Sequence, residues 1–247
     1  MTERNPNAVV VAVGHDPIDA ALAFAAGEAT RAGCGLHLVH VVHLLAHGPE
    51  TLLVVETSLE RVGRQALNAA LERAHDVVPA GVLVTAELRI GGVVTTLVDM
   101  ATDARMIVLE RRDLSRAMRV VTRSASSGVA AHARVPVVSV PSHWSPPGAH
   151  GDVPTVTVGV DIPQRAEPVL RAGATEARGR GALLHVLHTW SFPGAYDDII
   201  LARTESADWA ARATSEIQTV IDAIGDDVAG ISVRIDARHA HPADALI

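Results

Sequence analysis

Five arginines lie close together between two apolar segments of the sequence. Residues 106–110 and 135–140 have the length and composition of buried strands, and the segment between them is basic. Its arginines are Arg111, Arg112, Arg116, Arg119 and Arg123. Guanidinium groups bind phosphate oxygens, and a helix beginning near Ser124 would add free backbone amides. The alternative, which we favour, is a solvated loop whose arginines pair with Glu110 and Asp113 or line an assembly interface.

Four histidines follow one another at short spacing in and after another apolar segment, and they raise the question of a metal site. They are His37, His40, His43 and His47. Successive side chains of a strand point to opposite faces, so His40 would face away from His37 and His43. No HExxH pattern or Cys/His pair accompanies them. We therefore expect no metal, and instead an imidazole bonded to neighbouring backbone.

The remaining nucleophiles and phosphate-binding patterns give no support for catalysis. The segment TRSASSGV lacks the Gly-x-Ser-x-Gly elbow, and its serines Ser124, Ser126 and Ser127 are explained as helix-capping residues. Cys34 has no basic neighbour in the sequence that would activate it. Neither GxxxxGKS/T nor GxGxxG occurs. We expect that the protein is not an enzyme.

Short Val-rich runs alternate with helical patterns along the chain, which predicts an α/β fold. Segments 8–14, 36–42, 106–110 and 135–140 are nearly unbroken by polar residues, as in parallel strands covered on both faces. Residues 82–90 alternate instead, which predicts a strand nearer the sheet edge. A helix is predicted to follow the first run, with Asp16 at its N-cap, Pro17 at its first position and a glycine at its end. Alternating order and right-handed crossovers predict an open, doubly wound, mostly parallel sheet of the Rossmann-like kind.

The pattern of the first part of the chain returns in the second. VVVAVGHDP is answered by VTVGVDIP, GLHLVHVVH by ALLHVLHTW, and VTAELRIGGVVTTLV by VRIDARHAHPADALI. His37 and His40 thereby correspond to His185 and His188. We predict a first domain over residues 1–142, a Pro/Gly-rich linker over 143–153 and a second domain of the same fold over 154–247. The second is incomplete, because nothing in it corresponds to residues 99–140.

Composition limits the partners and the compartment. The formal net charge of −7 at pH 7 argues against a nucleic-acid partner, since such proteins present a basic face to many phosphates. No segment has the roughly 18 uninterrupted apolar residues of a membrane helix, so no membrane partner is expected. The single cysteine and the absence of a secretory signal pattern predict a cytoplasmic location.

With these features in place, the whole chain resembles a tandem universal stress protein. It keeps the second-strand pattern LVHVV at 38–42, the serine of the family's Gly-x2-Gly-x9-Gly-Ser loop as Ser124, and the final strand as ARVPVVSVP. The three loop glycines are replaced by Glu110, Asp113 and Arg123. Glycine lets backbone amides approach a phosphate closely, so these replacements predict a degenerate nucleotide site.

The resemblance implies which residues would form that site. The nucleotide-binding residues of the two copies would be Gly14, His15, Val42, Arg112, Arg123, Ser124 and Asp161. Gly14 and His15 replace the family's aspartate at the end of the first strand, whereas the second copy keeps it as Asp161. No cofactor is certain. ATP or another adenine nucleotide is the possible ligand that the resemblance implies.

Two functions remain open at this point. The favoured one is a non-enzymatic regulatory or stress-response module with a degenerate nucleotide motif. The alternative is an ATP- or adenine-nucleotide-binding stress sensor with at most slow hydrolysis. An open second sheet leaves a strand edge that proteins usually cover, so we expect a homodimer, with residues 135–141 available for strand pairing, and a possible protein partner.

Overall fold

The chain was analysed as a computed structural model that describes residues 6–43, 49–111, 125–146, 153–191 and 206–246, without the side chains of 49–57. Its contacts divide it into two compact units, Met1–Pro146 and Pro147–Ile247. Each unit is described by itself. No helix of the described residues is long and apolar enough to cross a membrane.

The first unit contains a five-stranded parallel sheet in the order β3-β2-β1-β4-β5. Its strands are β1 (Val9–Val13), β2 (Leu36–Val42), β3 (Val84–Ile90), β4 (Met106–Arg111) and β5 (Val137–Pro141). The parallel sheet predicted from the Val-rich runs is confirmed, and the alternating segment lies at the edge as β3. Chain order reverses between β1 and β4, which is the switch point where doubly wound sheets bind ligands outside their carboxyl ends.

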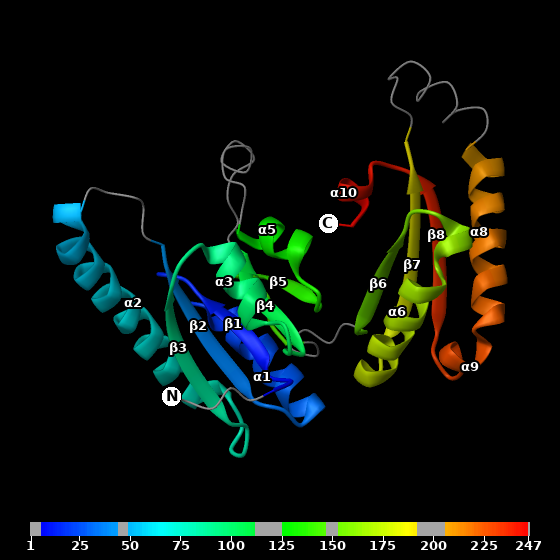
Figure 1. Ribbon diagram of the computed structural model, residues 1–247. Coiled ribbons are helices and arrows are strands. Elements are labelled where there is room, and N and C mark those ends of the chain that lie inside the picture. The colour runs from blue at the N-terminus through cyan, green and yellow to red at the C-terminus, as the bar shows by residue number, and fades with distance from the viewer. Residues whose placement is uncertain (1–5, 44–48, 112–124, 147–152, 192–205, 247) are drawn as a thin grey trace. The chain divides into compact units, whose positions relative to one another are not determined.

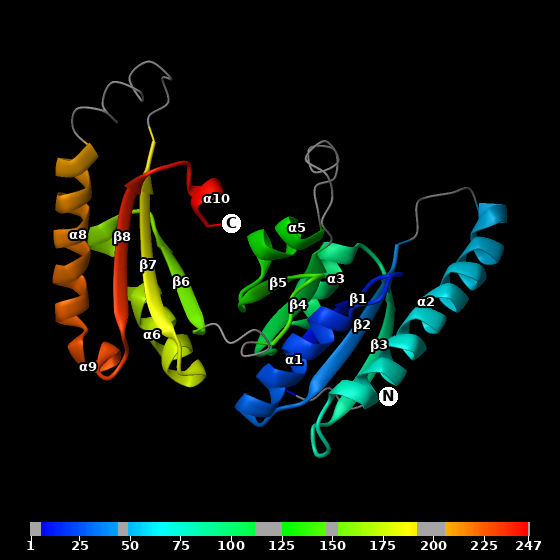
Figure 2. The same ribbon diagram turned by 180° about the vertical axis from the view of Figure 1, so that it is seen from behind.

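Helices cover both faces of this sheet (Figures 1 and 2). Helices α1 (Asp19–Ala32) and α2 (Pro49–Val77) cover one face, and α3 (Val93–Met100) and α5 (Ala125–His132) cover the other. The residues of β1 alternate between the two sides: Val9 and Val11 pack with α1, whereas Val10 packs with α3 and α5. This double burial explains why the strand sequences are continuously apolar.

The start of α1 differs from the prediction. The helix begins at Asp19 with Ile18 at the N-cap position and no side-chain cap, so Asp16 does not cap it. The amide of Leu22 bonds to the carbonyl of Ile18 at 2.9 Å. The amide of Ala21 is satisfied from far away in the sequence, as described below. The predicted glycine end is confirmed, because Gly33 has a left-handed φ of 63° that favours glycine.

The second unit contains a three-stranded parallel sheet in the order β6-β7-β8. Its strands are β6 (Thr155–Val160), β7 (Leu183–Trp190) and β8 (Val233–His239). Its helical segments are η1 (Pro163–Arg165), α6 (Glu167–Arg180), α8 (Ser206–Ala223), α9 (Gly225–Val228) and α10 (Pro242–Ala245). Side chains of α6 and α8 pack on β6 and β7 to form the core of this unit. The β-α-β-α-β order of the first unit is thus repeated.

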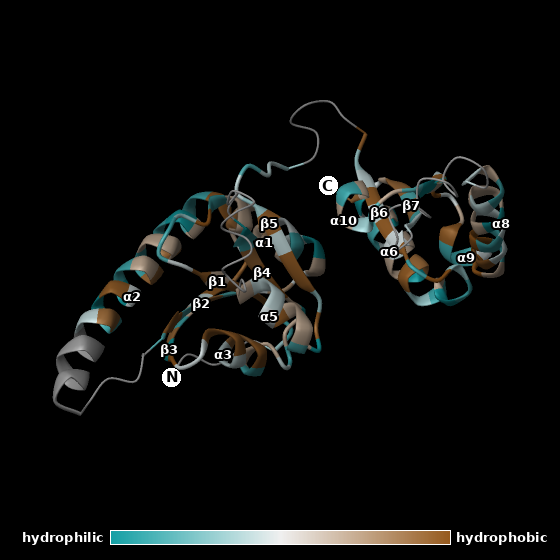
Figure 3. Cartoon of the chain, turned by 90° about the horizontal axis from the view of Figure 1, so that it is seen from above, coloured by the Kyte–Doolittle hydropathy of each residue, from teal (hydrophilic) through white to brown (hydrophobic). Residues whose placement is uncertain are grey.

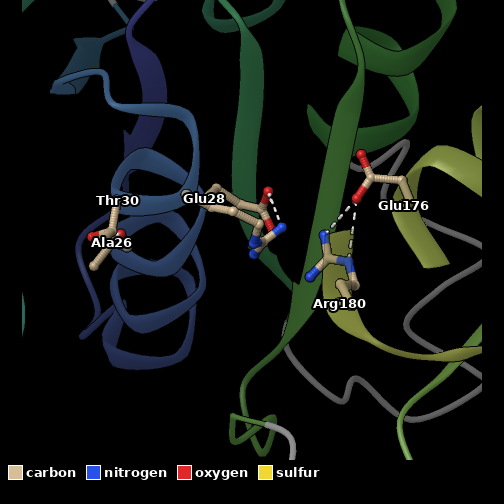
Figure 4. A network of polar contacts seen from close by, with 6 residues as sticks. Ala26, Glu28, Thr30, Glu176 and Arg180 are labelled. Carbon is tan, nitrogen blue, oxygen red and sulfur yellow. Dashed lines mark hydrogen bonds and ion pairs between the residues drawn. The ribbon is translucent and has the colours of Figure 1, made fainter. Parts of the chain in front are cut away.

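Helices α1 and α6 occupy equivalent places in the two units and end alike. Each is followed by a left-handed glycine, Gly33 or Gly181, that turns the chain into the next strand. Their last turns bear polar side chains tied within the helix (Figure 4). Thr30 donates to the carbonyl of Ala26 at 2.7 Å, and Arg180 pairs with Glu176 at 2.9 Å. Figure 3 shows hydrophobic residues along the strands and mixed hydropathy on the helices, as expected of layered packing.

Candidate functional site

A pocket of about 290 Å³ lies at the carboxyl ends of β1 and β2 in the first unit. Gly14, His15 and Val42, three of the residues expected from the sequence, all line it. The other lining residues are Ala12, Val13, Val39, His40, Val41, His43, Leu59, Val93 and Leu97. Aliphatic walls with a few ring nitrogens suit a planar, largely apolar group with hydrogen-bonding edges.

Between β3 and the pocket residue Val93 lies a glycine turn that the sequence analysis did not single out. The amide of Gly91 donates to the carbonyl of Val42 at 3.0 Å, and His43 Nδ1 lies 3.3 Å from the carbonyl oxygen of Gly91. Gly91 has a φ of 156°, and a Cβ there would lie 2.8 Å from Thr96 Oγ1. The Gly-Gly pair at 91–92, placed between a strand and a helix, was the signal that could have found this turn.

His40 holds the end of β1 in place. Its Nδ1 lies 2.9 Å from the carbonyl oxygen of Val13, and both residues are buried. Because a carbonyl only accepts, Nδ1 must carry the proton. Burial lowers the pKa of His40, and the nearby His15 lowers it further, against the raising effect of the bond to Val13. The neutral Nδ1–H form therefore prevails near neutral pH, and it fixes the backbone just before Gly14.

The same bond is present in the second unit. His188 Nδ1 lies 2.8 Å from the carbonyl oxygen of Val160, the last residue of β6. In both ladders the histidine is directly opposite the residue whose carbonyl it binds. The expectation that the repeated histidines bind neighbouring backbone is thus confirmed for this pair.

Helix α2 leaves room for the His40 ring by carrying glycine at position 63. A Cβ at Gly63 would lie 2.7 Å from His40 Cδ2, 3.0 Å from His40 Nε2 and 2.9 Å from Leu88 Cδ1. Real Cβ atoms do not approach other atoms so closely without a shift. On the other side, the ring of His15 meets that of His40 edge-on, with 5.2 Å between centroids. His40 is therefore held between a helix and the turn that lines the pocket.

Glu110 connects the end of β4 to the start of α1. Its Oε2 accepts a hydrogen bond of 3.0 Å from the backbone amide of Ala21, in the first turn of α1. A helix N-terminus carries a positive partial charge, so the carboxylate serves as a remote cap where Ile18 provides none. Continuing the register of β1 and β4 places Glu110 level with Val13, at the switch point.

The other expected site residues lie outside the described residues or in the second unit. Arg112, Arg123 and Ser124 lie outside the described residues, and Arg111, at the end of β4, is exposed. The helix expected near Ser124 begins, within the described chain, at Ala125. Asp161 follows β6 in the second unit and is exposed.

The histidines of β2 point to opposite faces, as predicted from strand alternation. His40 faces α2 at Gly63, whereas His37 Nδ1 lies 2.8 Å from Thr85 Oγ1 and the ring lines a small hollow with Met100 of α3. Within the ranges that the structure describes, no group of three or more His, Cys, Asp or Glu side chains could hold a metal ion.

The fold and the pocket define a Rossmann-like α/β protein with a candidate ligand site at the carboxyl end of its central strands. Comparison with known proteins gives the family. Residues 6–141, more than half of the chain, match the sequence model of the universal stress protein family, and the chain belongs to that family.

Relatives and solved structures agree with this assignment. A universal stress protein of Mycolicibacterium smegmatis is 31% identical over 178 residues, 70% of this chain and 60% of the relative. Universal stress protein Rv2005c of Mycobacterium tuberculosis is 31% identical over 199 residues, 76% of this chain and 65% of the relative. The chain thus spans less than two thirds of either relative. The crystal structure of a universal stress protein from Archaeoglobus fulgidus covers 97% of this chain and 80% of its own, with a TM-score of 0.67 and 16% identity, and so shares the fold.

Proposed function

We propose that this protein is a non-enzymatic regulatory module of the stress response, which does not use ATP hydrolysis. The observation that carries the proposal is the contact of Glu110 with the amide of Ala21. Glu110 stands at the position of the first glycine of the family's phosphate loop, as the resemblance implies. A carboxylate that already binds a helix N-terminus at the switch point occupies the kind of place that a phosphate group would use.

Charge supports the same conclusion. Two like charges about 4 Å apart repel by about 4 kcal/mol at the effective dielectric of a protein surface. A phosphate brought to the start of α1 would meet the Glu110 carboxylate and compete with it for the amide of Ala21. The carboxylate therefore disfavours the charged part of a nucleotide, whatever binds in the neighbouring pocket.

A second candidate function is an adenine-nucleotide sensor, and the pocket itself favours it. Its volume of about 290 Å³ and its aliphatic walls suit a nucleobase, and it is lined by Val42, one of the nucleotide-binding residues that the family resemblance implies. In this case the base would bind beside Gly14 and His15, and hydrolysis would be at most slow.

A calorimetric titration of nucleotide-free protein with ATP and with adenosine separates the two functions. The first predicts no ATP binding up to millimolar concentration by the native chain, and a gain of ATP binding in Glu110→Gln. The matched control is Glu72→Gln, which removes an exposed acid of α2. Micromolar binding of ATP by the native chain would refute the first function, with or without hydrolysis. Micromolar binding without hydrolysis would establish the sensor.

The partner and the compartment belong to the same proposal. We propose a cytoplasmic homodimer in which β5 pairs with its counterpart, and a protein partner as the target of regulation. The support is that β5 stands at the edge of its sheet and bonds only to β4 among the described strands. Light scattering at micromolar concentration should give the dimer mass, and a monomer would contradict the pairing.

A further inference from the structure

The sheet of the second unit has one face that the described helices leave largely uncovered, and we call it the open face. Helices α6 and α8 pack on the other face, where Leu184 and Val186 are buried (Figure 1). Thr155 and Thr157 of β6 lie on the open face, and both are exposed. Among the described residues of this unit, only α10 and Leu246 lie over the open face, at the carboxyl end of the strands.

The equivalent face of the first unit is apolar and covered. Val10 of β1 packs there with α3 and α5 and is 2% exposed. Its equivalent in β6 is Thr157, because each lies level with the corresponding histidine of the next strand. By the same register, the buried Thr85 of β3 is replaced by the exposed Arg234 of β8. An exposed hydroxyl and an exposed guanidinium suit a polar partner and disfavour an apolar cover.

His185 connects the polar groups of the open face. Arg234 Nη2 lies 3.4 Å from His185 Nε2, and His185 Nδ1 lies 3.4 Å from Thr157 Oγ1. Because a guanidinium only donates, Nε2 accepts, and the proton of the neutral ring is on Nδ1, which donates to Thr157. The hydroxyl proton of Thr157 and the other N–H groups of Arg234 then remain for a ligand that accepts hydrogen bonds.

The charge around His185 is dominated by arginine. Arg234 and Arg238 lie on the same side of β8, with Asp236 between them. Asp236 Oδ2 lies 3.5 Å from Arg238 Nε, whereas Arg234 forms no ion pair within the described chain. Burial lowers the pKa of His185, and the charge of Arg234 lowers it further. Asp236 raises this pKa and Arg238 lowers it. Asp244 of α10 adds a carboxylate only at the carboxyl end, so the part of the open face around Arg234 is positive.

We propose that the open face docks an acidic helix of a partner protein, whose carboxylates accept hydrogen bonds from Arg234 and Arg238. A helix is the expected cover, because α3 and α5 cover the equivalent face of the first unit. The two arginines are four residues apart on one strand, which is about 13 Å, and two turns of a helix rise about 11 Å. Acidic residues seven apart in the partner would therefore lie level with both arginines.

Three alanine-rich helical peptides of equal length test this proposal. The first carries two glutamates seven residues apart on one face, the second carries them nine residues apart on opposite faces, and the third has lysines in place of the glutamates of the first. Fluorescence anisotropy with the full chain at low ionic strength should show the first peptide binding about fivefold more tightly than the second, the value of one exposed ion pair. The lysine peptide should not bind, and salt should weaken the binding of the first. Equal affinity of the three peptides would overturn the proposal.

Variants of exposed residues locate the binding without disturbing the fold. Arg234→Gln keeps a long polar side chain but removes the charge, and it should weaken binding of the first peptide about fivefold. The matched control is Arg212→Gln, which removes an exposed arginine of α8 on the covered face of the sheet and should leave this binding unchanged. Equal weakening by the two variants would indicate an effect of net charge alone and would refute the assignment.

Two further measurements separate other occupants of the open face. Displacement of the first peptide by an equal concentration of inorganic phosphate would assign the face to a small anion. A change of mass in light scattering of Arg234→Gln would assign it to a second copy of the chain, and either result would overturn the proposal. The inference specifies the protein partner of the function proposed above and rests on it in that respect. Because the open face belongs to the second unit and its test uses no ATP, either proposal can fail without the other.

Discussion

The contact between His40 and helix α2 predicts that two chemically identical glycine replacements have opposite effects on stability. Gly27 lies in the interior of α1 and is exposed, and a Cβ there would meet nothing within 4 Å. Gly63 lies in the interior of α2 and is buried, and a Cβ there would lie 2.7 Å from His40 Cδ2. In the interior of either helix, alanine is more favourable than glycine by about 1 kcal/mol of helix propensity. Only at position 63 would the new methyl group force neighbouring side chains to move.

The magnitude at position 63 follows from what must move. Overpacking of a buried site costs about 1–3 kcal/mol, and displacement of the His40 ring would leave the buried carbonyl of Val13 unpaired at about 1–3 kcal/mol more. After the helix gain of about 1 kcal/mol is subtracted, Gly63→Ala should destabilise the first unit by about 1–5 kcal/mol, whereas Gly27→Ala should stabilise it by about 1 kcal/mol.

Urea unfolding followed by tryptophan fluorescence can measure this for the first unit alone. The chain has three tryptophans, and Trp144 packs edge-on against Phe24 of α1 with 5.4 Å between ring centroids. Replacing Trp190 and Trp209 by Phe leaves Trp144 as the only reporter. A Gly63→Ala variant as stable as Gly27→Ala would refute the steric account of His40, because both would then show helix propensity only.

Three further predictions follow from the packing and the histidine bonds. His40→Leu should lose adenosine binding if the first pocket binds a base, whereas His40→Asn, whose amide can still donate to Val13, should retain most of it in the same calorimetric assay. Gly173→Ala should destabilise the second unit by up to about 2 kcal/mol after the helix gain of about 1 kcal/mol is subtracted, measured by Trp190 and Trp209 fluorescence, because a Cβ there would clash with Val158 Cγ2. The pKa of His40 in the folded state is lowered below 6.5, so the unfolded chain binds the proton more readily and the free energy of unfolding should fall as pH drops below about 6.5. In a plot of the urea midpoint against pH, His40→Asn should flatten this decrease. An unchanged slope would contradict the role of His40.

Local patterns in the sequence were sufficient for the sheet. Runs such as LHLVHVV are buried on both faces and so are apolar throughout, while VTAELRI has one polar face because it lies at the edge. Burial on one or both faces of a strand can therefore be predicted from consecutive residues. The same holds for the glycine end of α1, where only Gly33 accepts the left-handed backbone without strain.

The contacts that build the site could not be predicted from local sequence patterns, because they join residues that are far apart in the sequence. Glu110 and Ala21 are 89 residues apart, so nothing in the sequence connected the acid of β4 to the start of α1. A helix with Asp16 and Pro17 at its start was the natural prediction, and it was wrong because the cap comes from β4. Gly63 likewise has no local signature, since its reason lies in the His40 ring of another element.

The histidine bonds at the ends of β1 and β6 belong to the structure of the strand-to-helix turn, and they do not depend on the residue that follows the strand. Both units hold the last carbonyl of their first strand with a histidine from the second strand, at 2.9 and 2.8 Å, although the residues that follow are Gly14 in one unit and Asp161 in the other. Because the histidine bond is present in both units although the residue after the strand differs, the bond stabilises the turn and does not depend on that residue. It follows that the turn is a fixed platform, and the function proposed above assigns ligand choice to the groups around it, Glu110 in the first unit and the Asp161 carboxylate in the second. Exchange of Gly14 for Asp should therefore alter which ligands bind without loosening the His40 bond.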